Sequence, residues 1–422
     1  MQTDKASIIA HIDMNSYFAS CEQQANPHLR GKPVGVCAYL SANGCIIASS
    51  IEAKQLGIKT GFRVKDALLL CPDIVLIQNE PAKYRTITSQ IFSILADYTD
   101  EVEPYSIDEA FLDLTGHVDD LERAKIIGLK IKKRIKQEIG EWLKSSMGIA
   151  GTRWLAKFGS DIASKDDLLV IRKKDLEKIF AKVKLTDAWG INKRTEIRLN
   201  ALGIYDLNDL KNYPVTNLMQ ALGKNGYYLW ANVNGIELTG LKDGEEQKPK
   251  SIGHSYCLPK RTTDKKYLNS ILLKLCEKTG RRLRAQGLEA KQIYVGWGYV
   301  SGNGMYKQQK LAISVFDTIG IYKRAAGIFN SYKLLDKVRF LAVSVSNLIP
   351  LQSQTAFWQD LLKPKKIAKA MDRINDKFGE YSIMYGSMHG LDKNAQERIG
   401  FRKSEQVKFL NKNRLTFSDK EL

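Results

Sequence analysis

The chain has 422 residues, and a hydrophobic content of 44% is enough for packed cores rather than disorder. Its length predicts about two to four domains. A formal net charge of +19 predicts a polyanionic partner, either nucleic acid or an anionic membrane surface. No apolar run reaches the roughly 18 residues that a membrane-spanning helix needs, and the N-terminus lacks a signal-peptide core. We therefore disfavour the membrane and expect a cytoplasmic location.

The six cysteines are scattered along the chain, and no two of them form a CxxC pair. This spacing is typical of reduced thiols, and it excludes both a disulfide framework and a cysteine-based zinc site as organising features.

The first predicted element is a strand over residues 7–13, which is apolar on both faces and therefore fits the centre of a sheet. It ends in Asp13. Asn15 or Ser16 follows as a candidate N-cap for a helix. A single aspartate at a strand end is also common without any function, so Asp13 alone decides nothing.

A second acidic position is the pair Asp108 and Glu109, which stands at the head of a predicted buried strand. Burying unpaired charge is unfavourable, and the nearest basic residues in sequence, Arg85 and Arg123, are well away. A divalent cation is therefore a natural partner, although a solvated turn would explain the pair equally well. If this strand lies beside the first, Asp13 completes the carboxylate cluster that two metal ions need.

The elements between and after these acids predict an α+β layer with an antiparallel sheet. The small residues 48–50 allow close approach to the backbone, and Lys54 can reach an anion. We expect helices at 83–98, 119–139 and 152–164, and a strand at 146–151. The last of these helices carries Arg153 and Lys157.

Residues 175–236 are predicted to be helical with short loops. Within them, the segment 189–195 and the turn at Gly203 resemble a helix–hairpin–helix, whose loop amides hold a DNA phosphate without reading sequence. The candidate DNA contacts are Gly190, Asn192, Lys193 and Gly203. Asn192 stands where a second glycine is usual, and it tolerates unusual backbone angles. A plain helical hairpin remains the alternative.

A polar stretch at 241–250 reads as a linker, and the order strand, helix, strand, strand, helix, strand follows it. The expected ranges are 251–258, 264–287, 291–300, 310–316, 319–334 and 337–346. Basic residues flank these strands, so the sheet can sit on duplex phosphates, with Lys250, Ser251 and Arg339 as candidate contacts. A solvated sheet face is the alternative. Residues beyond 350 are expected to form a tail with helical potential at 363–378.

Together these segments resemble the Y-family translesion DNA polymerases over roughly residues 7–350. The resemblance is carried by residues 13–22 (DMNSYFASCE), 44–48 (GCIIA), 52–54 (EAK), 105–111 (YSIDEAF), 148–150 (GIA) and 250–253 (KSIG). Residues 20–22 and 44–45 favour the bacterial UmuC type. The C-terminal module matches by pattern rather than by residues, so the DinB (polymerase IV) type remains open.

The resemblance implies a right hand with palm, fingers, thumb and little finger. The palm would comprise residues 1–15 and 78–168, and the fingers residues 16–77. The thumb, with its helix–hairpin–helix, would comprise 169–240. After the linker, the little finger would comprise 251–350 and a C-terminal tail region 351–422.

The resemblance also implies a catalytic site that holds two Mg²⁺ ions on Asp13, Asp108 and Glu109, with the Met14 carbonyl as a further ligand. Phe18 matches the position of a steric gate against ribose. The other implied nucleotide-binding residues are Tyr17, Ser49, Lys54 and Lys165. Ile51 and Lys54 depart from a Tyr and an Arg that are frequent in the family. Lysine lacks the bidentate fork of arginine.

The implied activity is template-directed, low-fidelity DNA synthesis across damaged bases. The expected partners are primer-template DNA, dNTPs and a sliding clamp, and the UmuC type would add a UmuD-type subunit and a recombinase filament. A clamp-binding peptide is expected at Gln354, Phe357 and Trp358, with residues 406–410 as a second candidate. The alternatives are a non-catalytic DNA- or clamp-binding scaffold that retains the fold, and another palm-fold metal enzyme such as a nucleotide cyclase.

Overall fold

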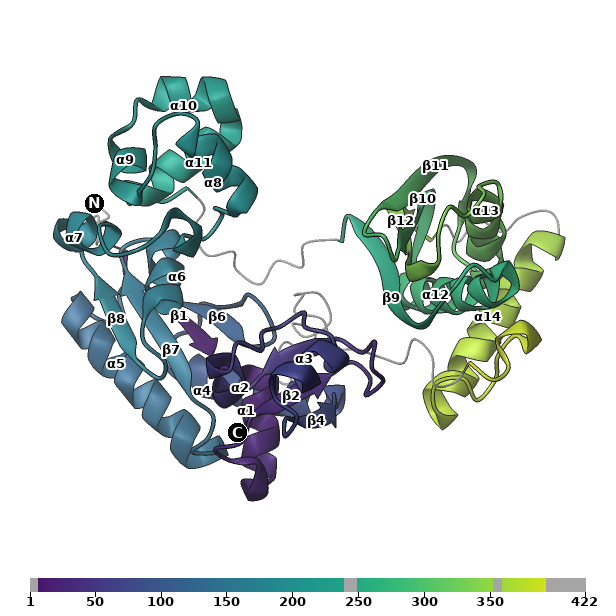
Figure 1. The fold of residues 1–422 in the computed structure, drawn as a ribbon, viewed down its shortest axis with the longest axis horizontal. Helices are drawn as coiled ribbons and strands as arrows, with labels where there is room; N and C mark the ends of the chain where they lie inside the picture. The colour runs from purple at the N-terminus through teal and green to yellow at the C-terminus, as the bar shows by residue number, and fades with distance from the viewer. Residues whose placement is uncertain (1–6, 239–248, 352–358, 392–422) are drawn as a thin grey trace, which may run out of the picture. The chain divides into compact units, whose positions relative to one another are not determined.

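The computed structural model describes residues 7–238, 249–351 and 359–391 (Figure 1). The chain divides into two compact units, with the division between Glu246 and Gln247. This division lies inside the segment expected to be a linker. The two units are described separately below.

The first unit is built on a five-stranded sheet with the order β5-β6-β1-β7-β8. The strands are β1 (Ile9–Met14), β5 (Val102–Pro104), β6 (Glu109–Asp113), β7 (Ser145–Ala150) and β8 (Leu168–Ile171). The expected antiparallel pairing holds for β5, β6, β1 and β7, whereas β8 pairs parallel to β7 and was not predicted. The strand that ends in Asp13 therefore lies at the centre of the sheet.

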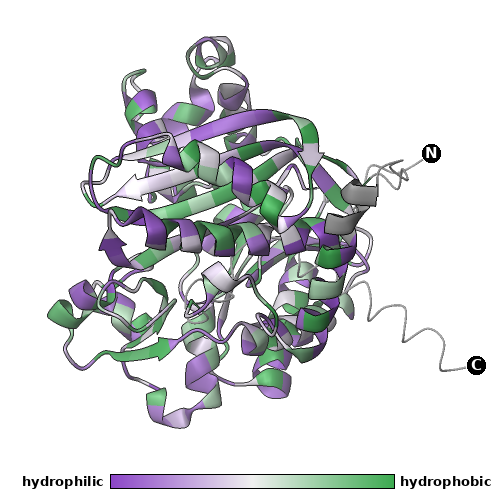
Figure 2. Ribbon diagram, turned by 90° about the vertical axis from the view of Figure 1, so that its right-hand side faces the viewer, coloured by the Kyte–Doolittle hydropathy of each residue, from purple (hydrophilic) through white to green (hydrophobic). Residues whose placement is uncertain are grey.

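Helices cover both faces of this sheet, which explains why β1 has buried apolar residues on both of its faces. Ala10 and Ile12 face a core shared with α4 (Pro81–Ala96) and α5 (Leu121–Arg134), the latter continuing as a π turn over Ile135–Ile139. On the other face, Ile9 packs with α6 (Arg153–Ile162). Hydrophilic and hydrophobic residues both occur along the helices of the chain (Figure 2), as expected for amphipathic elements.

Glycine allows α6 to lie close against the sheet. A Cβ atom at Gly148 on β7 would lie 2.0 Å from the Ala156 carbonyl oxygen of α6, so no other residue fits this position without moving the helix. The close packing fixes α6, and with it the side chains that α6 directs toward the end of the sheet.

A smaller layer follows β1 in the chain, in the region expected to form the fingers. It has a three-stranded sheet in the order β3-β2-β4 and three helices. The elements are α1 (Tyr17–Ala25), β2 (Val34–Cys37), β3 (Ile46–Ser49), α2 (Ile51–Gln55), α3 (Val64–Leu70) and β4 (Val75–Gln78).

Ser16, one of the two candidate residues, occupies the N-cap position of α1, and its carbonyl oxygen accepts from the Ser20 N–H at 3.0 Å. Its side chain makes no capping hydrogen bond, and its backbone is left-handed with φ of 51°. The Asn15 amide instead donates to Ser146 Oγ at 3.0 Å and accepts from the Asp166 backbone N–H at 2.8 Å. Asn15 therefore ties the end of β1 to the loop before β8.

The rest of the first unit is helical, as the sequence predicted, and shares one apolar core with α6 and the adjoining face of the five-stranded sheet. Its helices are α7 (Leu176–Phe180), α8 (Lys193–Asn200), α9 (Leu207–Asn212), α10 (Val215–Leu222) and α11 (Lys224–Val233).

The second unit has the predicted β-α-β-β-α-β order and an antiparallel sheet arranged β11-β10-β12-β9. Trp297 lies at its centre and packs edge-to-face on Phe329 with a centroid separation of 5.3 Å. The elements are β9 (Ser251–Thr262), α12 (Lys265–Ala285), β10 (Leu288–Tyr299), β11 (Gly304–Val315), α13 (Thr318–Asn330) and β12 (Val338–Pro350).

Part of the region expected to be a tail belongs to this second unit. Helix α14 (Gln359–Phe378) carries Asp372, whose carboxylate accepts two hydrogen bonds from the largely buried Arg284 guanidinium of α12, at 2.7 and 2.8 Å. Arg281 binds Asp376 at 2.7 Å. Ion pairs therefore attach α14 to α12. In the described part of the chain, no helix is long and apolar enough to cross a membrane.

The Arg284–Asp372 pair predicts how strongly α14 is held. Replacing Asp372 with alanine leaves a buried guanidinium without its bidentate partner, so the second unit should lose about 3 kcal/mol of unfolding free energy. Urea unfolding of the full chain measures this loss. Asp376→Ala is the control, because its carboxylate is 68% exposed and should cost less than about 1 kcal/mol. Equal losses in the two variants would contradict a dominant role for the buried pair.

Candidate active site

Three carboxylates meet where β1 and β6 lie side by side. Asp13 is directly opposite Glu109 in the antiparallel register. The backbone N–H of Met14 donates to the Asp108 carbonyl oxygen at 2.9 Å, which extends the pairing by one residue. The two strands are therefore neighbours, as the three-carboxylate hypothesis required. All three acidic residues are partly exposed rather than fully enclosed.

Two of these carboxylates lack enough positive charge from the protein. Burial, followed by repulsion from Glu109 and Asp108, raises the pKa of Asp13 well above its ordinary value. Burial also raises the pKa of Asp108 to about 6, although hydrogen bonding from the Ser106 hydroxyl opposes the shift. The chain itself therefore does not stabilise the ionised forms of Asp13 and Asp108.

Glu109 differs, because α6 supplies it with a cation. Lys157 Nζ lies 2.6 Å from Glu109 Oε2, and the lysine side chain is only 9% exposed. Burial alone would raise the pKa of Glu109, but contacts with His11 and Lys157 outweigh burial and lower it to about 2. The expectation that no basic residue is available was wrong here, because it considered distance along the chain rather than the packing of α6 on the sheet.

His11 is the second residue that contacts Glu109, and the sequence analysis did not identify it. Its Nδ1 lies 2.6 Å from Ser160 Oγ and its Nε2 lies 3.3 Å from Glu109 Oε2. Burial lowers the pKa of His11 to about 4, so the ring is neutral near pH 7. The Ser160 hydroxyl donates to the Lys157 carbonyl oxygen at 2.7 Å, so its oxygen accepts from the N–H at Nδ1 of His11. In this tautomer Nε2 carries no proton, and it has no hydrogen-bond partner among the described residues.

The residues present fit divalent cations in their chemistry. Magnesium prefers carboxylate oxygens, and Asp13 and Asp108 are acids whose charge the protein does not neutralise. As the side chains stand in the described residues, no three His, Cys, Asp or Glu groups converge on one ion position. Lys157 holds Glu109 through Oε2, which accounts for this arrangement.

The predicted triphosphate contacts lie around the same acids. Ser49, at the end of β3, is fully buried, and its hydroxyl oxygen has no hydrogen-bond partner among the described residues. Burial, then repulsion by Lys165, lowers the pKa of Lys54, while Asp13 and Asp108 oppose the shift. Lys54 and Lys165 therefore act in the same electrostatic field as the carboxylates. An unpartnered hydroxyl and two lysines suit an anionic ligand.

Tyr17 and Phe18 are core residues in this structure. The Tyr17 hydroxyl donates to the Tyr84 carbonyl oxygen at 2.9 Å and lies 2.8 Å from Thr88 Oγ1, so a nucleotide contact would have to use its main chain. Phe18 has no exposed surface and stacks on the Tyr84 ring with a centroid separation of 4.4 Å. The steric-gate role of Phe18 stays a prediction.

The loop before α8 differs in detail from the expected phosphate-binding turn. Asn192 has an ordinary extended backbone rather than a left-handed one, and its Oδ1 accepts hydrogen bonds from the N–H groups of Arg194 and Thr195 at 3.0 Å. Asparagine is therefore an N-cap here, and those two amides are already occupied. Gly190 and Gly203 have φ of 98° and 81°, which glycine adopts without strain.

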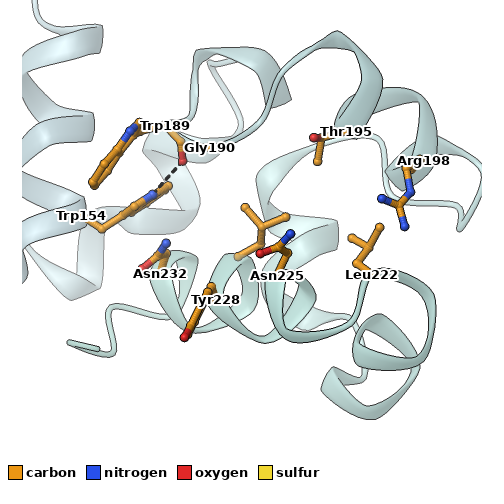
Figure 3. A pocket seen from close by; sticks show the side chains of 10 residues that line it. Trp154, Trp189, Gly190, Thr195, Arg198, Leu222, Asn225, Tyr228 and Asn232 are labelled. Carbon is orange, nitrogen blue, oxygen red and sulfur yellow. Dashed lines mark hydrogen bonds between the residues drawn. The ribbon is translucent and has the colours of Figure 1, made fainter. Parts of the chain in front are cut away.

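Gly190 also lines a cavity of about 390 Å³ between this loop and α11 (Figure 3). Trp154 and Trp189 form one side, and the Trp154 indole donates to the Trp189 carbonyl oxygen at 3.0 Å. Asn225 and Asn232 of α11 line the cavity as well. Aromatic and amide groups thus adjoin the candidate DNA-binding loop, and Trp154 links it to α6.

The candidate contacts of the second unit lie along two strands. Ser251 begins β9 opposite Ser346, with the exposed Lys250 just before it. Arg339 on β12 donates from Nε to the Tyr299 carbonyl oxygen at 2.7 Å. The proposed clamp-binding residues Gln354, Phe357 and Trp358, and the second peptide at 406–410, lie outside the described residues.

Comparisons with known proteins identify relatives across both units. A model of the impB/mucB/samB family matches residues 12–161, and a model of the family's C-terminal domain matches residues 249–359. DNA polymerase IV of Pelotomaculum thermopropionicum is 30% identical over 375 residues, covering 88% of this chain and 93% of that protein. DNA polymerase IV 1 of Bacillus subtilis is 30% identical over 407 residues, covering 94% and 97%.

A solved structure agrees with these relatives. The Y-family DNA polymerase chimera Dbh-Dpo4(243-245)-Dbh is similar with a TM-score of 0.72 and 25% identity, covering 81% of this chain and 99% of that chain. The preference for the UmuC type is not supported, because these relatives carry the name DNA polymerase IV.

The raised pKa of Asp108 predicts a pH-dependent stability in metal-free buffer. The folded pKa of about 6 exceeds the unfolded value near 3.9, so the folded state binds more protons and wild-type stability falls as pH rises from about 4 to 6. Asp108→Asn carries no charge. In EDTA at pH 7.5 it should exceed wild type by up to about 3 kcal/mol of unfolding free energy, with the gap closing toward pH 4.

Urea unfolding in EDTA at pH 4 and at pH 7.5 measures the difference in unfolding free energy between Asp108→Asn and wild type. Asp119→Asn is the control, because its side chain is 72% exposed and should show no such gain. A constant difference between Asp108→Asn and wild type across this pH range would contradict the charge explanation.

Proposed function

The chain belongs to the Y-family of DNA polymerases and is a DNA-directed DNA polymerase of the translesion class, and we propose that Asp13, Asp108 and Glu109 form its catalytic centre. One observation carries this proposal. Adjacent strands bring the three acids to one end of the sheet, and two of the acids have raised pKa values that a cation would relieve.

Asp13, Asp108 and Glu109, with the Met14 carbonyl, would hold two magnesium ions. When bound, such ions lower the pKa of a primer 3′-hydroxyl and neutralise the charge of the triphosphate and the leaving pyrophosphate. The chain itself orients the ligands: the Ser106 hydroxyl bonds the Asp108 carboxylate, and Lys157 of α6 holds Glu109, with the His11 ring beside it.

Ser49, Lys54 and Lys165 are proposed to bind the triphosphate. Lys54 bears its charge beside Asp13 and Asp108, where it can draw phosphates toward the acids. The loop of Lys165 is fixed from behind, because Asp166 binds Lys136 at 2.5 Å and its N–H donates to Asn15. A loop with a fixed backbone loses less freedom when Lys165 binds a phosphate.

Primer-template DNA is proposed to bind the thumb loop at Gly190, Asn192, Lys193 and Gly203. In the little finger, Lys250, Ser251 and Arg339 are proposed as further contacts. Lys193 supports this, since its side chain is 86% exposed and can reach a phosphate. Asn192 would act by shaping the loop, because its side chain is already bonded to Arg194 and Thr195.

The proposed hand keeps the palm at 1–15 and 78–168, the fingers at 16–77, the thumb at 169–240 and the little finger at 251–350. A sliding clamp is the further partner, through Gln354, Phe357 and Trp358. The expectation of a UmuD-type subunit and a recombinase filament depended on the UmuC type, which the relatives do not support. The alternative of an inactive scaffold is not favoured. A chain that had lost catalysis would be expected to lack one or more of the catalytic acids, and Asp13, Asp108 and Glu109 are all present.

Primer extension by the purified full chain tests the catalytic centre. With magnesium and dNTPs the wild type should extend a primer on an undamaged template and insert opposite an abasic site, and EDTA should stop both. Asp108→Ala should reduce extension by at least about 10³-fold, because it removes a metal ligand. Its affinity for primer-template DNA should stay within about threefold of wild type. Loss of DNA binding in this variant would show that Asp108 is misassigned.

Phe18 predicts sugar selectivity. Truncating the ring should open space for a ribose 2′-hydroxyl and raise incorporation of ribonucleotides relative to dNTPs by about 100-fold or more, a few kcal/mol of discrimination. Because Phe18 is fully buried, Phe18→Ala also leaves a cavity, so Phe18→Leu serves as the less disruptive variant. Single-nucleotide insertion kinetics measure the ratio. Unchanged selectivity in a folded Phe18→Leu or Phe18→Ala variant would refute the gate.

A further inference from the structure

One lysine of α6 lies between two carboxylates. Lys157 Nζ is 2.6 Å from Glu109 Oε2 on β6 and 3.5 Å from Asp161 Oδ1, which belongs to the next turn of the same helix. The first distance is that of a short, charge-assisted hydrogen bond, whereas the second is longer than a well-formed hydrogen bond. Lys157 therefore binds Glu109 most closely and has Asp161 as a second partner within reach.

Two aromatic rings also lie close to the ammonium group of Lys157. Its Nζ is 5.4 Å from the centre of the Tyr105 ring and 6.0 Å from the centre of the Trp189 ring. The lysine side chain is only 9% exposed, so water is a poor substitute for a carboxylate that moves away. A buried charge that loses its partner is strongly destabilising. The ammonium group of Lys157 therefore needs a carboxylate partner whatever Glu109 does.

Glu109 cannot use the same oxygen for Lys157 and for a cation. As the side chains stand in the described residues, the acids do not converge on one ion position, and the hydrogen bond from Lys157 occupies Glu109 Oε2. If Glu109 is a metal ligand, its carboxylate must turn from Lys157 toward Asp13 and Asp108. Lys157 then needs another anion.

Asp161 has the properties that this second partner needs. It follows Lys157 by four residues on α6, a spacing that places two side chains of a helix side by side. Its carboxylate is 30% exposed, so water solvates it while Lys157 is bound to Glu109. The flexible four-carbon stem of lysine lets the ammonium group move between the two carboxylates. Helix α6 itself can stay in place against Gly148 of β7.

We propose that Asp161 is a positioning residue, which takes over the ammonium group of Lys157 when Glu109 turns to bind a divalent cation. The exchange lowers the cost of releasing Glu109, because the buried lysine keeps a carboxylate partner in both states. In this role Asp161 acts through Lys157 rather than as a ligand. The inference rests on the proposed function, since it requires Glu109 to be a metal ligand.

Binding of Mn²⁺ to the full chain, without DNA or dNTPs, tests the exchange. Mn²⁺ prefers the same oxygen ligands as Mg²⁺, and the paramagnetic resonance signal of the free ion gives its dissociation constant without any catalysis. Asp161→Asn should weaken Mn²⁺ binding by about 2- to 150-fold, the range of coupling between groups in contact. Asp161→Glu keeps the carboxylate and should bind Mn²⁺ nearly as tightly as wild type.

A double-mutant cycle separates the exchange from a simple effect of charge. Removal of a negative charge near the acids would weaken cation binding at long range whether or not Lys157 is present. In the exchange, Asp161 acts through Lys157, so Asp161→Asn should have no effect on Mn²⁺ affinity in a Lys157→Met background. Lys157→Met alone should bind Mn²⁺ at least as tightly as wild type, because Glu109 no longer has a competing partner.

Lys157→Gln repeats the cycle with a polar side chain, and circular dichroism shows which variants are folded. Two results would overturn the exchange alone. One is equal Mn²⁺ affinity in wild type and Asp161→Asn, and the other is an effect of Asp161→Asn that persists in the folded Lys157→Met or Lys157→Gln background.

Asp13→Asn distinguishes failure of the exchange from failure of the proposed metal site. It removes the charge of a proposed ligand that Lys157 does not bind, and it should abolish tight Mn²⁺ binding. Unchanged Mn²⁺ affinity in Asp13→Asn would overturn the metal site and the exchange together. Loss of Mn²⁺ binding in Asp13→Asn, with no coupling between Asp161 and Lys157, would overturn the exchange and leave the metal site standing.

Discussion

Negative charge at the end of two paired strands is the constraint on which the first unit depends. Asp13 and Glu109 face each other across β1 and β6, and Asp108 adjoins Met14 one step further. Three carboxylates this close repel one another, and partial burial adds to the cost. The chain outweighs this cost at Glu109, which is paired with Lys157, but not at Asp13 or Asp108. The remaining imbalance at Asp13 and Asp108 is the property that makes the site receptive to cations.

The packed elements around the acids hold the negative charge of Asp13 and Asp108 at the end of the sheet. Gly148 lets α6 lie against β7, so that Lys157 reaches Glu109 from one side of the sheet. From the other direction, Asn15 joins the end of β1 to Ser146 and to Asp166, beside Lys165. The packing of these elements, rather than contacts among the acids, thus fixes where the acids and the lysines lie.

The parts of this arrangement that follow from local pattern could be predicted, and those that follow from packing could not. The alternation of residues in β10 and the short apolar run in β1 both predict strands. The positions of the acids at strand ends could be read from the ends of these predicted strands. The role of Lys157 depends on how α6 crosses the sheet, a contact across 48 positions of sequence. Ser16 and Asn192 show the same limit for backbone conformation, since each residue type allows both a capping and a left-handed state.

Charge also sets the conditions under which the site at the end of β1 can bind ligands. Asp13 and Asp108 favour cations, whereas Lys54, which acts in the same electrostatic field, favours anions. Recognition that depends on charge must change in strength with pH, metal and salt. The dependence on pH follows from the acids, because protonation removes the charge that favours a cation.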